Sequence, residues 1–213
     1  AHHPLEREAL TRALLGLKAP EVVVEAHVSG GLPQFTVIGL IETAVRESRD
    51  RVRAAISQSG LEFPDGRITV NLAPADLPKG GSGFDLAIAV AILAASGQLR
   101  RERLAGIEFY GELALSGLLR RVPGLLAALM AARRSGRFAI VPAAGESEAA
   151  LLGGDRIGLA DQLADVVRCL NDRGALRPPR AEAAVCGAAG TAGREDLAEV
   201  RGQAQARHAL EVA

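Results

Sequence analysis

The chain has 213 residues and a mass of 22.1 kDa, and its 48% of hydrophobic residues supply a core, which excludes disordered and collagen-like classes. The 25 Lys and Arg residues balance 25 Asp and Glu residues, so a protein held on DNA by its overall positive charge is excluded, although a local basic patch is not. Because aromatic residues make up only 3% of the chain, stacking of bases on aromatic side chains is not expected.

Three strands and one helix are predicted in the first part of the chain. Alternating β-branched residues predict strands at 21–28, 34–38 and 67–72, and the turn residues at 30–33 make the first two a hairpin. Apolar residues at helical spacing predict a helix at 42–59. The segment 73–81 has two prolines and two glycines and is predicted to be a loop.

Helices and strands are predicted to alternate in the next part of the chain. Residues 84–95 are apolar nearly all round, which is typical of a buried helix. Further strands are predicted at 107–113, 138–141 and 156–159, and further helices at 125–134, 146–152 and 161–170. We expect Leu126, Leu129 and Met130 to face the core and Asp161 to cap the last helix.

The two ends of the chain are predicted to lie outside this domain. Residues 1–14, which begin with Ala1-His2-His3, are interpreted as a tag and an N-terminal segment. Residues 171–193 have no hydrophobic period and contain adjacent prolines, which predicts a linker. Residues 194–213 regain helical spacing and are interpreted as the start of a second domain. The main domain is therefore expected at residues 15–170.

Cysteine use and hydropathy bear on location. Cys169 and Cys186 are too few for a disulfide framework and lack CxxC spacing, which indicates a reducing compartment. The longest uncharged run, residues 86–99, is shorter than the about 20 residues that a membrane-spanning helix needs. We therefore expect a cytoplasmic protein with no membrane contact.

The loop Lys79-Gly80-Gly81-Ser82-Gly83 has two interpretations. A lysine beside a serine can form a dyad in which the neutral amine activates the hydroxyl group. Alternatively, Ser82 is the N-cap of the next helix and Asp85 completes a capping box. The second interpretation is favoured because Lys18 is the only other lysine. Residues 79–83 are also a candidate anion site, because they precede a helix N-terminus.

Arginines are concentrated in two places. Arg46, Arg49 and Arg53 lie three and four residues apart, so they share one stripe of the predicted helix and are candidate contacts for DNA phosphates. The alternative is a solvated face balanced by Glu42, Glu47 and Asp50. A second cluster comprises Arg120, Arg121, Arg133, Arg134 and Arg137. No metal site is predicted, because His27 and His208 lack neighbouring ligands at suitable spacing.

Six stretches carry a family resemblance. They are Gly31-Leu32-Pro33, VIGL at 37–40, ETAVRESRDRVR at 42–53, RITVNLAPADLPK at 67–79, FDL at 84–86 and DLAEVRGQ at 196–203. Together they resemble the magnesium-chelatase-related AAA+ ATPases of the ComM/YifB type, over residues 15–213. The resemblance implies an α+β fold at 15–170, namely a Lon-protease-like domain with the mixed sheet and packed helices of ribosomal protein S5 domain 2. An AAA+ module that forms hexamers would begin at 194–213.

The resemblance also bears on catalysis. Lon-type proteases carry a catalytic serine in a segment to which residues 78–84 align, but Gly83 falls at the serine position and Ser82 lies one residue early. No lysine follows Lys79, and no phosphate-binding GxxxxGK[ST] loop is present. We therefore predict no catalytic residue, no enzyme activity and no cofactor for this chain. The full-length protein is expected to be an ATPase that uses ATP and Mg²⁺.

Two functions are consistent with the sequence. In the first, a non-proteolytic domain helps a homo-hexameric AAA+ ATPase to engage single-stranded or branched DNA during branch migration in natural transformation and recombination. In the second, the domain binds protein partners, its own AAA+ module or other subunits of the ring, and does not touch DNA. A continuous strip of free arginines would favour DNA, whereas arginines paired with carboxylates would favour assembly.

Overall fold

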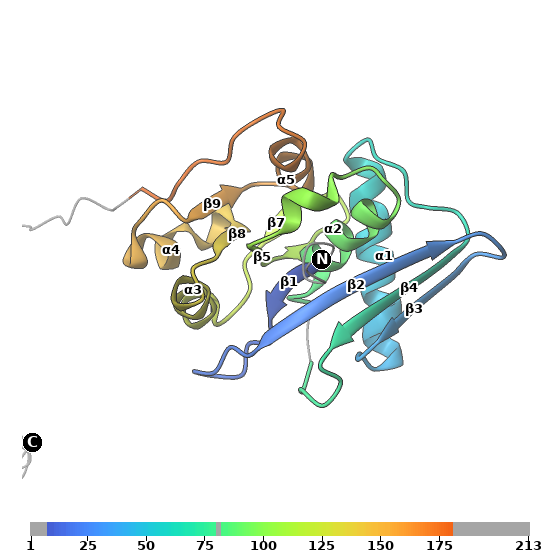
Figure 1. The fold of residues 1–213 in the computed structure, drawn as a ribbon, viewed down its shortest axis with the longest axis horizontal. Helices are drawn as coiled ribbons and strands as arrows, with labels where there is room; N and C mark the ends of the chain where they lie inside the picture. The colour runs from blue at the N-terminus through green and yellow to red at the C-terminus, as the bar shows by residue number, and fades with distance from the viewer. Residues whose placement is uncertain (1–7, 80–81, 181–213) are drawn as a thin grey trace, which may run out of the picture. The chain divides into compact units, whose positions relative to one another are not determined.

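The protein folds around a seven-stranded mixed sheet (Figure 1). The computed structural model describes residues 8–79 and 82–180. In spatial order, the strands are β3, β4, β2, β1, β5, β8 and β9. Their bounds are Ala9–Arg12 (β1), Glu21–Ser29 (β2), Gln34–Ile38 (β3), Arg67–Ala73 (β4), Ile107–Phe109 (β5), Phe138–Pro142 (β8) and Ile157–Ala160 (β9).

Four of the six strand pairings in this sheet are parallel. Only β1–β2 and β2–β4 are antiparallel. Two short strands, Glu112–Leu113 (β6) and Leu119–Arg120 (β7), form a separate antiparallel pair. The described domain is therefore a mixed α/β structure with a mostly parallel sheet, and the prediction of a mixed sheet with packed helices is confirmed at this level.

The strands β2 and β3 do not form the predicted hairpin. β4 lies between them, antiparallel to β2 from the pair Val23–Ala73 to the pair Ser29–Arg67, and parallel to β3. Both strands therefore pair with the same later segment and not with each other, and the other edge of β2 pairs with β1. Local turn chemistry at 30–33 predicts the reversal of the chain but not the strand that enters between its arms.

The first described strand lies in the segment that the sequence analysis assigned to a tag. All four residues of β1 are buried, and β1 pairs with β2 on one side and β5 on the other. Thr11 and Arg12 belong to this buried strand, although their side chains are polar. The folded part therefore begins before Leu15, and the predicted start of the domain was too late.

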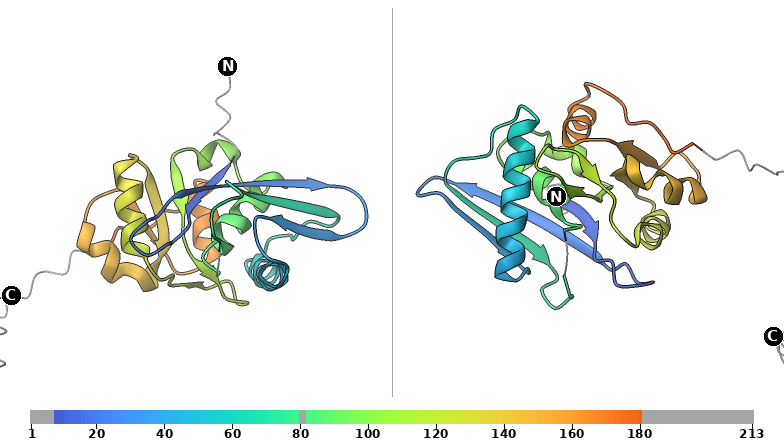
Figure 2. Two further views of the ribbon diagram at one scale, coloured as in Figure 1. Left: turned by 90° about the horizontal axis from the view of Figure 1, so that it is seen from below. Right: turned by 180° about the vertical axis from the view of Figure 1, so that it is seen from behind.

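Two helices cover one face of the sheet where β2, β4 and β3 lie, one of them packed on β2 and β4 and the other on β3 (Figure 2). They are Glu42–Gln58 (α1) and Asp85–Ala95 (α2), and they also pack against each other. α1 buries one side, including Val52, Ala55 and Ile56, as expected for an amphipathic helix. α2 is buried from Asp85 to Ala94, which confirms the predicted buried helix.

Three more helices complete the domain. They are Leu125–Arg134 (α3), Glu146–Leu152 (α4) and Leu163–Leu170 (α5), with short 3-10 turns at Arg101–Leu104 and Ala143–Gly145. α3 and α4 pack against each other over a second apolar cluster that includes Leu129, Val141 and Ala149. Met130 is 45% exposed, so its predicted inward position was wrong.

Gly111 divides the strand that was predicted at 107–113 into β5 and β6. Its φ of +151° is rare for residues with a side chain, and a Cβ atom there would lie 2.9 Å from Cδ2 of Leu119. The chain turns at this glycine, and β6 leaves the main sheet to pair with β7. This turn carries Glu112 toward the start of α2.

The last described segment packs on the domain. Gln162 and Asp165, rather than Asp161, form the capping box of α5. The Leu159 amide donates to the Arg177 carbonyl at 2.8 Å, so part of the predicted linker is attached to β9. The remaining linker residues and the predicted start of the AAA+ module, 194–213, lie outside the described residues, and that division stays a prediction.

Candidate functional site

The loop between β4 and α2 places Lys79 against backbone carbonyl groups. The Lys79 side chain is buried, and its ammonium group donates to the carbonyl oxygens of Pro74 and, at 3.3 Å, Leu77. These bonds hold the loop closed and use two of the three donors of the ammonium group. Gly80 and Gly81 of the predicted anion site lie outside the described residues. The role of the loop in anion binding therefore stays a prediction.

Ser82 contacts Glu112 of β6 rather than the backbone of α2. Its hydroxyl group donates to the Glu112 carboxylate, and Arg120 lies 3.6 Å from the same carboxylate. The N-cap of α2 is Phe84, without a side-chain cap, so the predicted capping role of Ser82 was wrong. The reason is that Ser82 lies two residues before the cap position, and its hydroxyl group accepts no hydrogen bond from a backbone amide of α2 within the described residues.

Asp85, the first residue of α2, joins α2 to α1. Its carboxylate accepts hydrogen bonds from Nε of Arg51 at 2.6 Å, from the Ser48 hydroxyl at 3.0 Å and from the Leu113 amide at 3.2 Å. Burial raises the pKa of Asp85, while the bond from Arg51 opposes this shift. The same bond raises the pKa of Arg51. This cluster ties together the start of α2, the middle of α1 and β6.

The Asp85 cluster was not predicted from the sequence, because the prediction for this helix concerned Arg46, Arg49 and Arg53 and not Arg51. Ser48 lies four residues before the buried Val52, and Arg51 lies four residues before the buried Ala55, so both flank the apolar side of the helix. A single carboxylate at the start of the otherwise apolar α2 was the other available signal. Buried carboxylates need partners, and Arg51 was the residue to expect.

The predicted arginine stripe lies on the exposed side of α1. Arg46 is 2.5 Å from Glu42 and Arg49 is 3.1 Å from Asp50, each as an ion pair. The guanidinium carbon of Arg53 lies 5.6 Å from the ring centre of Phe63, a cation–π distance. The structure brings the three arginines to one surface, as predicted, and pairs two of them with carboxylates.

The second arginine cluster divides into separate contacts. Arg120 and Arg121 pair with Glu112 and Glu148, respectively. Arg137 pairs with Glu21 and with Glu108, at 3.0 Å from the latter. Arg133 and Arg134 form the last turn of α3.

Glu108 of β5 is the centre of a buried ionic network that sequence reasoning also missed. It is fully buried and accepts a bidentate pair of hydrogen bonds from Arg12, at 2.8 and 2.9 Å. Arg137 and the Tyr110 hydroxyl donate to the same carboxylate. Burial raises the pKa of Tyr110 well above its usual value, with a further rise from the Glu108 charge. The network joins β1, β5 and the segment after α3.

The structure offers no metal centre within the residues it describes. No group of three His, Cys, Asp or Glu side chains in residues 8–79 and 82–180 could hold an ion. His27 is exposed on β2, and Cys169 is a partly buried free thiol. Cys186 and His208 lie outside the described part.

The predicted family membership is confirmed by comparison with known proteins. The chain belongs to the family described as subunit ChlI of Mg-chelatase, whose profile matches residues 24–145. It is 48% identical over 202 residues to the protein YifB of Escherichia coli strain K12, and 44% identical over 205 residues to the competence protein ComM of Haemophilus influenzae. An uncharacterised protein of Mycobacterium tuberculosis strain H37Rv is 39% identical over 217 residues.

These alignments cover 95–96% of this chain but only 39–40% of the relatives. The chain thus spans about two fifths of the length of the curated proteins that it matches. In the part that the structure describes, no helix is both long enough and apolar enough to cross a membrane.

The family match corrects one prediction from the sequence. We predicted that this chain is not an enzyme and that ATPase activity belongs only to the full-length protein. Residues 24–145, which this prediction called non-enzymatic, match a subunit of Mg-chelatase, which is an enzyme. The chain therefore belongs to an enzyme family. The prediction rested on two missing motifs, and the absence of a motif does not decide the class of a chain whose family is shown by a match over residues 24–145.

Proposed function

We propose that this chain is the amino-terminal part of an AAA+ ATPase of the ComM/YifB type that acts on DNA in competence and recombination. The observation that carries this proposal is the 44% identity to a competence protein along 95% of the chain. In this proposal the whole protein is a cytoplasmic homo-hexamer that drives branch migration or unwinding. The described domain is its Lon-like domain of the S5 domain 2 type, which the mixed sheet with α1 and α2 on one face supports.

ATP and Mg²⁺ belong to this proposal for the whole protein. The described residues of this chain do not fit an ATP–Mg²⁺ site: Lys79 is committed to backbone carbonyls, and no cluster of metal ligands occurs among them. The described part can bind, position or assemble through its charged surfaces.

A binding measurement on this chain tests the proposal. A labelled single-stranded oligonucleotide and a branched duplex are titrated with the chain at about 50 and about 200 mM salt, a range over which phosphate contacts weaken strongly. We expect binding that weakens with salt and that is similar for different base sequences, because contacts with phosphates carry no sequence information. A chain that binds neither probe at the lower salt concentration would contradict a DNA-contacting role.

The second candidate function is assembly of the ring, and one observation favours it at α1. Arg46 and Arg49 are already paired with Glu42 and Asp50, the pattern expected of a face that meets protein rather than phosphate. If α1 lies at a subunit contact, replacing Arg46, Arg49 and Arg53 with alanine in the full-length protein lowers the hexamer fraction in analytical ultracentrifugation. An unchanged hexamer fraction would argue against α1 as that contact.

A further inference from the structure

Two pockets adjoin the C-terminal end of α3, and basic side chains line both. The larger cavity, of about 700 Å³, lies between α3 and the loop from β1 to β2, and Lys18 and Arg134 are among its lining residues. The smaller, of about 380 Å³, lies between α3 and the turn before β9, and Arg133 and Arg156 are among its lining residues. Three separate segments of the chain thus bring cations to one end of α3.

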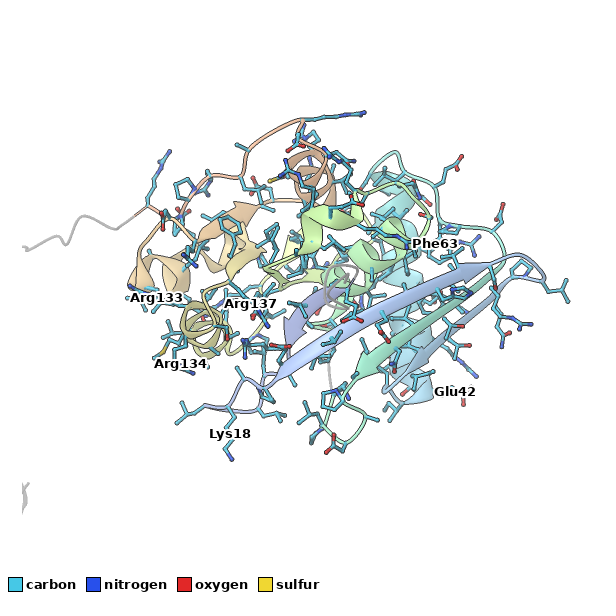
Figure 3. All side chains as sticks on the ribbon, in the orientation of Figure 1. Lys18, Glu42, Phe63, Arg133, Arg134 and Arg137 are labelled. Atoms are coloured by element: carbon cyan, nitrogen blue, oxygen red, sulfur yellow. The ribbon has the colours of Figure 1, made fainter. Side chains whose placement is uncertain are left out.

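We call Lys18, Arg133, Arg134 and Arg156 the α3-end surface. Figure 3 shows Lys18, Arg133 and Arg134 gathered on this part of the domain, apart from Glu42 at the start of α1. All four residues of the surface are exposed. Within the described residues, none of the four forms an ion pair with a carboxylate. Their positive charges are therefore available to a partner.

The walls of the two pockets add too little negative charge to cancel this surface. Arg12 lines the larger pocket and Arg137 the smaller, and both bind the buried Glu108. Among the described residues that line the two pockets, Asp155 is the only carboxylate. Four unpaired cations and one carboxylate leave a local excess of three positive charges on a chain whose net charge is zero.

Stabilisation of the helix end accounts for only part of this arrangement. Arginines in the last turn interact favourably with the helix dipole, and Arg133 donates to the Leu152 carbonyl at 3.1 Å. Arg156 donates to the Gly136 carbonyl just after α3. Lys18 comes from the loop after β1, and neither its side chain nor that of Arg134 forms a hydrogen bond within the described part. Neither of these two cations is held by a side-chain hydrogen bond or an ion pair there.

The side chains of the α3-end surface suit a polyanion that is recognised by its negative charges. Guanidinium groups match phosphate oxygens geometrically and are weakly hydrated. The described lining of the two pockets contains no Phe, Tyr or Trp, so bases have no platform for stacking. A phosphodiester backbone meets both conditions, since it supplies repeated charges and needs no recognition of bases.

We propose that the α3-end surface binds the sugar-phosphate backbone of DNA, and that it, rather than the arginine stripe of α1, is the DNA contact of this domain. The choice of DNA as the partner rests on the proposed function. The location of the contact rests on the unpaired cations around α3. Arg46 and Arg49 of α1 must first give up their own carboxylates before they can bind phosphate, whereas Lys18 and Arg134 need not.

Two triple variants with the same change in charge test this proposal. The first replaces Lys18, Arg133 and Arg134 with Gln, and the matched control replaces Arg46, Arg49 and Arg53 with Gln. Both lose three positive charges, so an effect of overall charge is equal in the two. Affinity for a labelled single strand and for its duplex is measured by fluorescence anisotropy at several salt concentrations.

We expect the first variant to bind about tenfold or more weakly on every base sequence, and its salt slope to flatten by about 0.7–0.9 for each lost phosphate contact. The control should keep most of its affinity. If the control loses as much affinity as the first variant, or more, the proposed location is wrong while the proposed function stands. If the unmodified chain binds no DNA, the proposed function fails first.

A double variant, Lys18→Gln with Arg134→Gln, keeps the bond from Arg133 to Leu152 and guards against loss of folding in the triple variant. We expect it to retain the unfolding midpoint of the unmodified chain and to lose DNA affinity. A double variant that folds normally and binds DNA with unchanged affinity would overturn the inference.

Discussion

Replacement of Glu108 with glutamine tests whether the buried ionic network holds the sheet together. The substitution keeps the shape of the side chain but removes the charge that faces Arg12, whose side chain is only 8% exposed. Arg137 keeps Glu21 as a partner, so Arg12 is the cation left without a counter-charge. Removing one partner of a buried pair costs about 3–5 kcal/mol. We expect the lower end, about 3 kcal/mol, because Arg12 retains the Ala19 carbonyl and the Ser135 hydroxyl as acceptors.

Urea unfolding followed by circular dichroism measures this loss as a lower midpoint at an unchanged slope. Thermal unfolding should shift by about 6–12 °C, since 1 kcal/mol corresponds to about 2–4 °C in a domain of this size. Glu21→Gln is the matched control, because Glu21 is half-exposed and pairs with Arg137 alone. Its loss should be about 1 kcal/mol or less. A loss below about 1 kcal/mol for Glu108→Gln would refute the view that Arg12 depends on this charge.

Three further predictions concern other contacts of the domain. Arg51→Ala should lower the free energy of unfolding in urea by about 2 kcal/mol, because its partner Asp85 is buried while Arg51 itself is partly exposed. Arg46→Ala on the same helix should lower it by only about 0.5 kcal/mol, because both members of its ion pair are exposed. Equal losses for the two variants would contradict a structural role for Asp85. Ser82→Ala should lower the free energy of unfolding by about 1 kcal/mol, the value of its one hydrogen bond to Glu112. A much larger loss would mean that Ser82 makes further stabilising contacts besides this bond. Hydrogen bonds from Arg177 and the Arg180 amide hold the pKa of Glu146 at about 2, so this interaction contributes stability above the usual pKa near 4.5 and loses it as the pH falls through about 2. Arg177→Ala should raise the pKa of Glu146 toward its usual value in an NMR titration of the carboxyl group, and an unchanged pKa would exclude Arg177 as the cause.

Local patterns in the sequence predicted most elements well, and they failed where distant segments meet. The bounds of β3, α3 and α4 match the predicted ranges, because each has a clear period and turn residues at its ends. β1 was missed because two of its four residues, Thr11 and Arg12, are polar, so the segment has no pattern typical of a buried strand. Arg12 is buried only because Glu108 lies opposite it, nearly a hundred residues further along the chain. No local pattern can supply that partner.

The candidate site shows the same division. Spacing along a helix correctly placed Arg46, Arg49 and Arg53 on one exposed surface. It could not tell which arginines are paired, since Asp85, the partner of Arg51, lies on another helix. It also could not bring Lys18 beside Arg134, because that proximity depends on how the loop after β1 meets the end of α3. Whether an arginine is paired with a carboxylate therefore depends on the folded structure and not on local spacing in the sequence.

Mapping the amides that respond to DNA tests directly whether the α3-end surface is the DNA contact. A labelled single strand is added to the isotope-labelled chain, and amide chemical shifts are followed by NMR at low salt. We predict chemical-shift changes around Lys18, around Arg133 and Arg134, and near Arg156, and we expect these changes to vanish as the salt concentration rises. The chemical shifts of the amides around Arg46 and Arg49 should not change. Chemical-shift changes concentrated on α1, with the end of α3 unaffected, would contradict DNA binding at the α3-end surface.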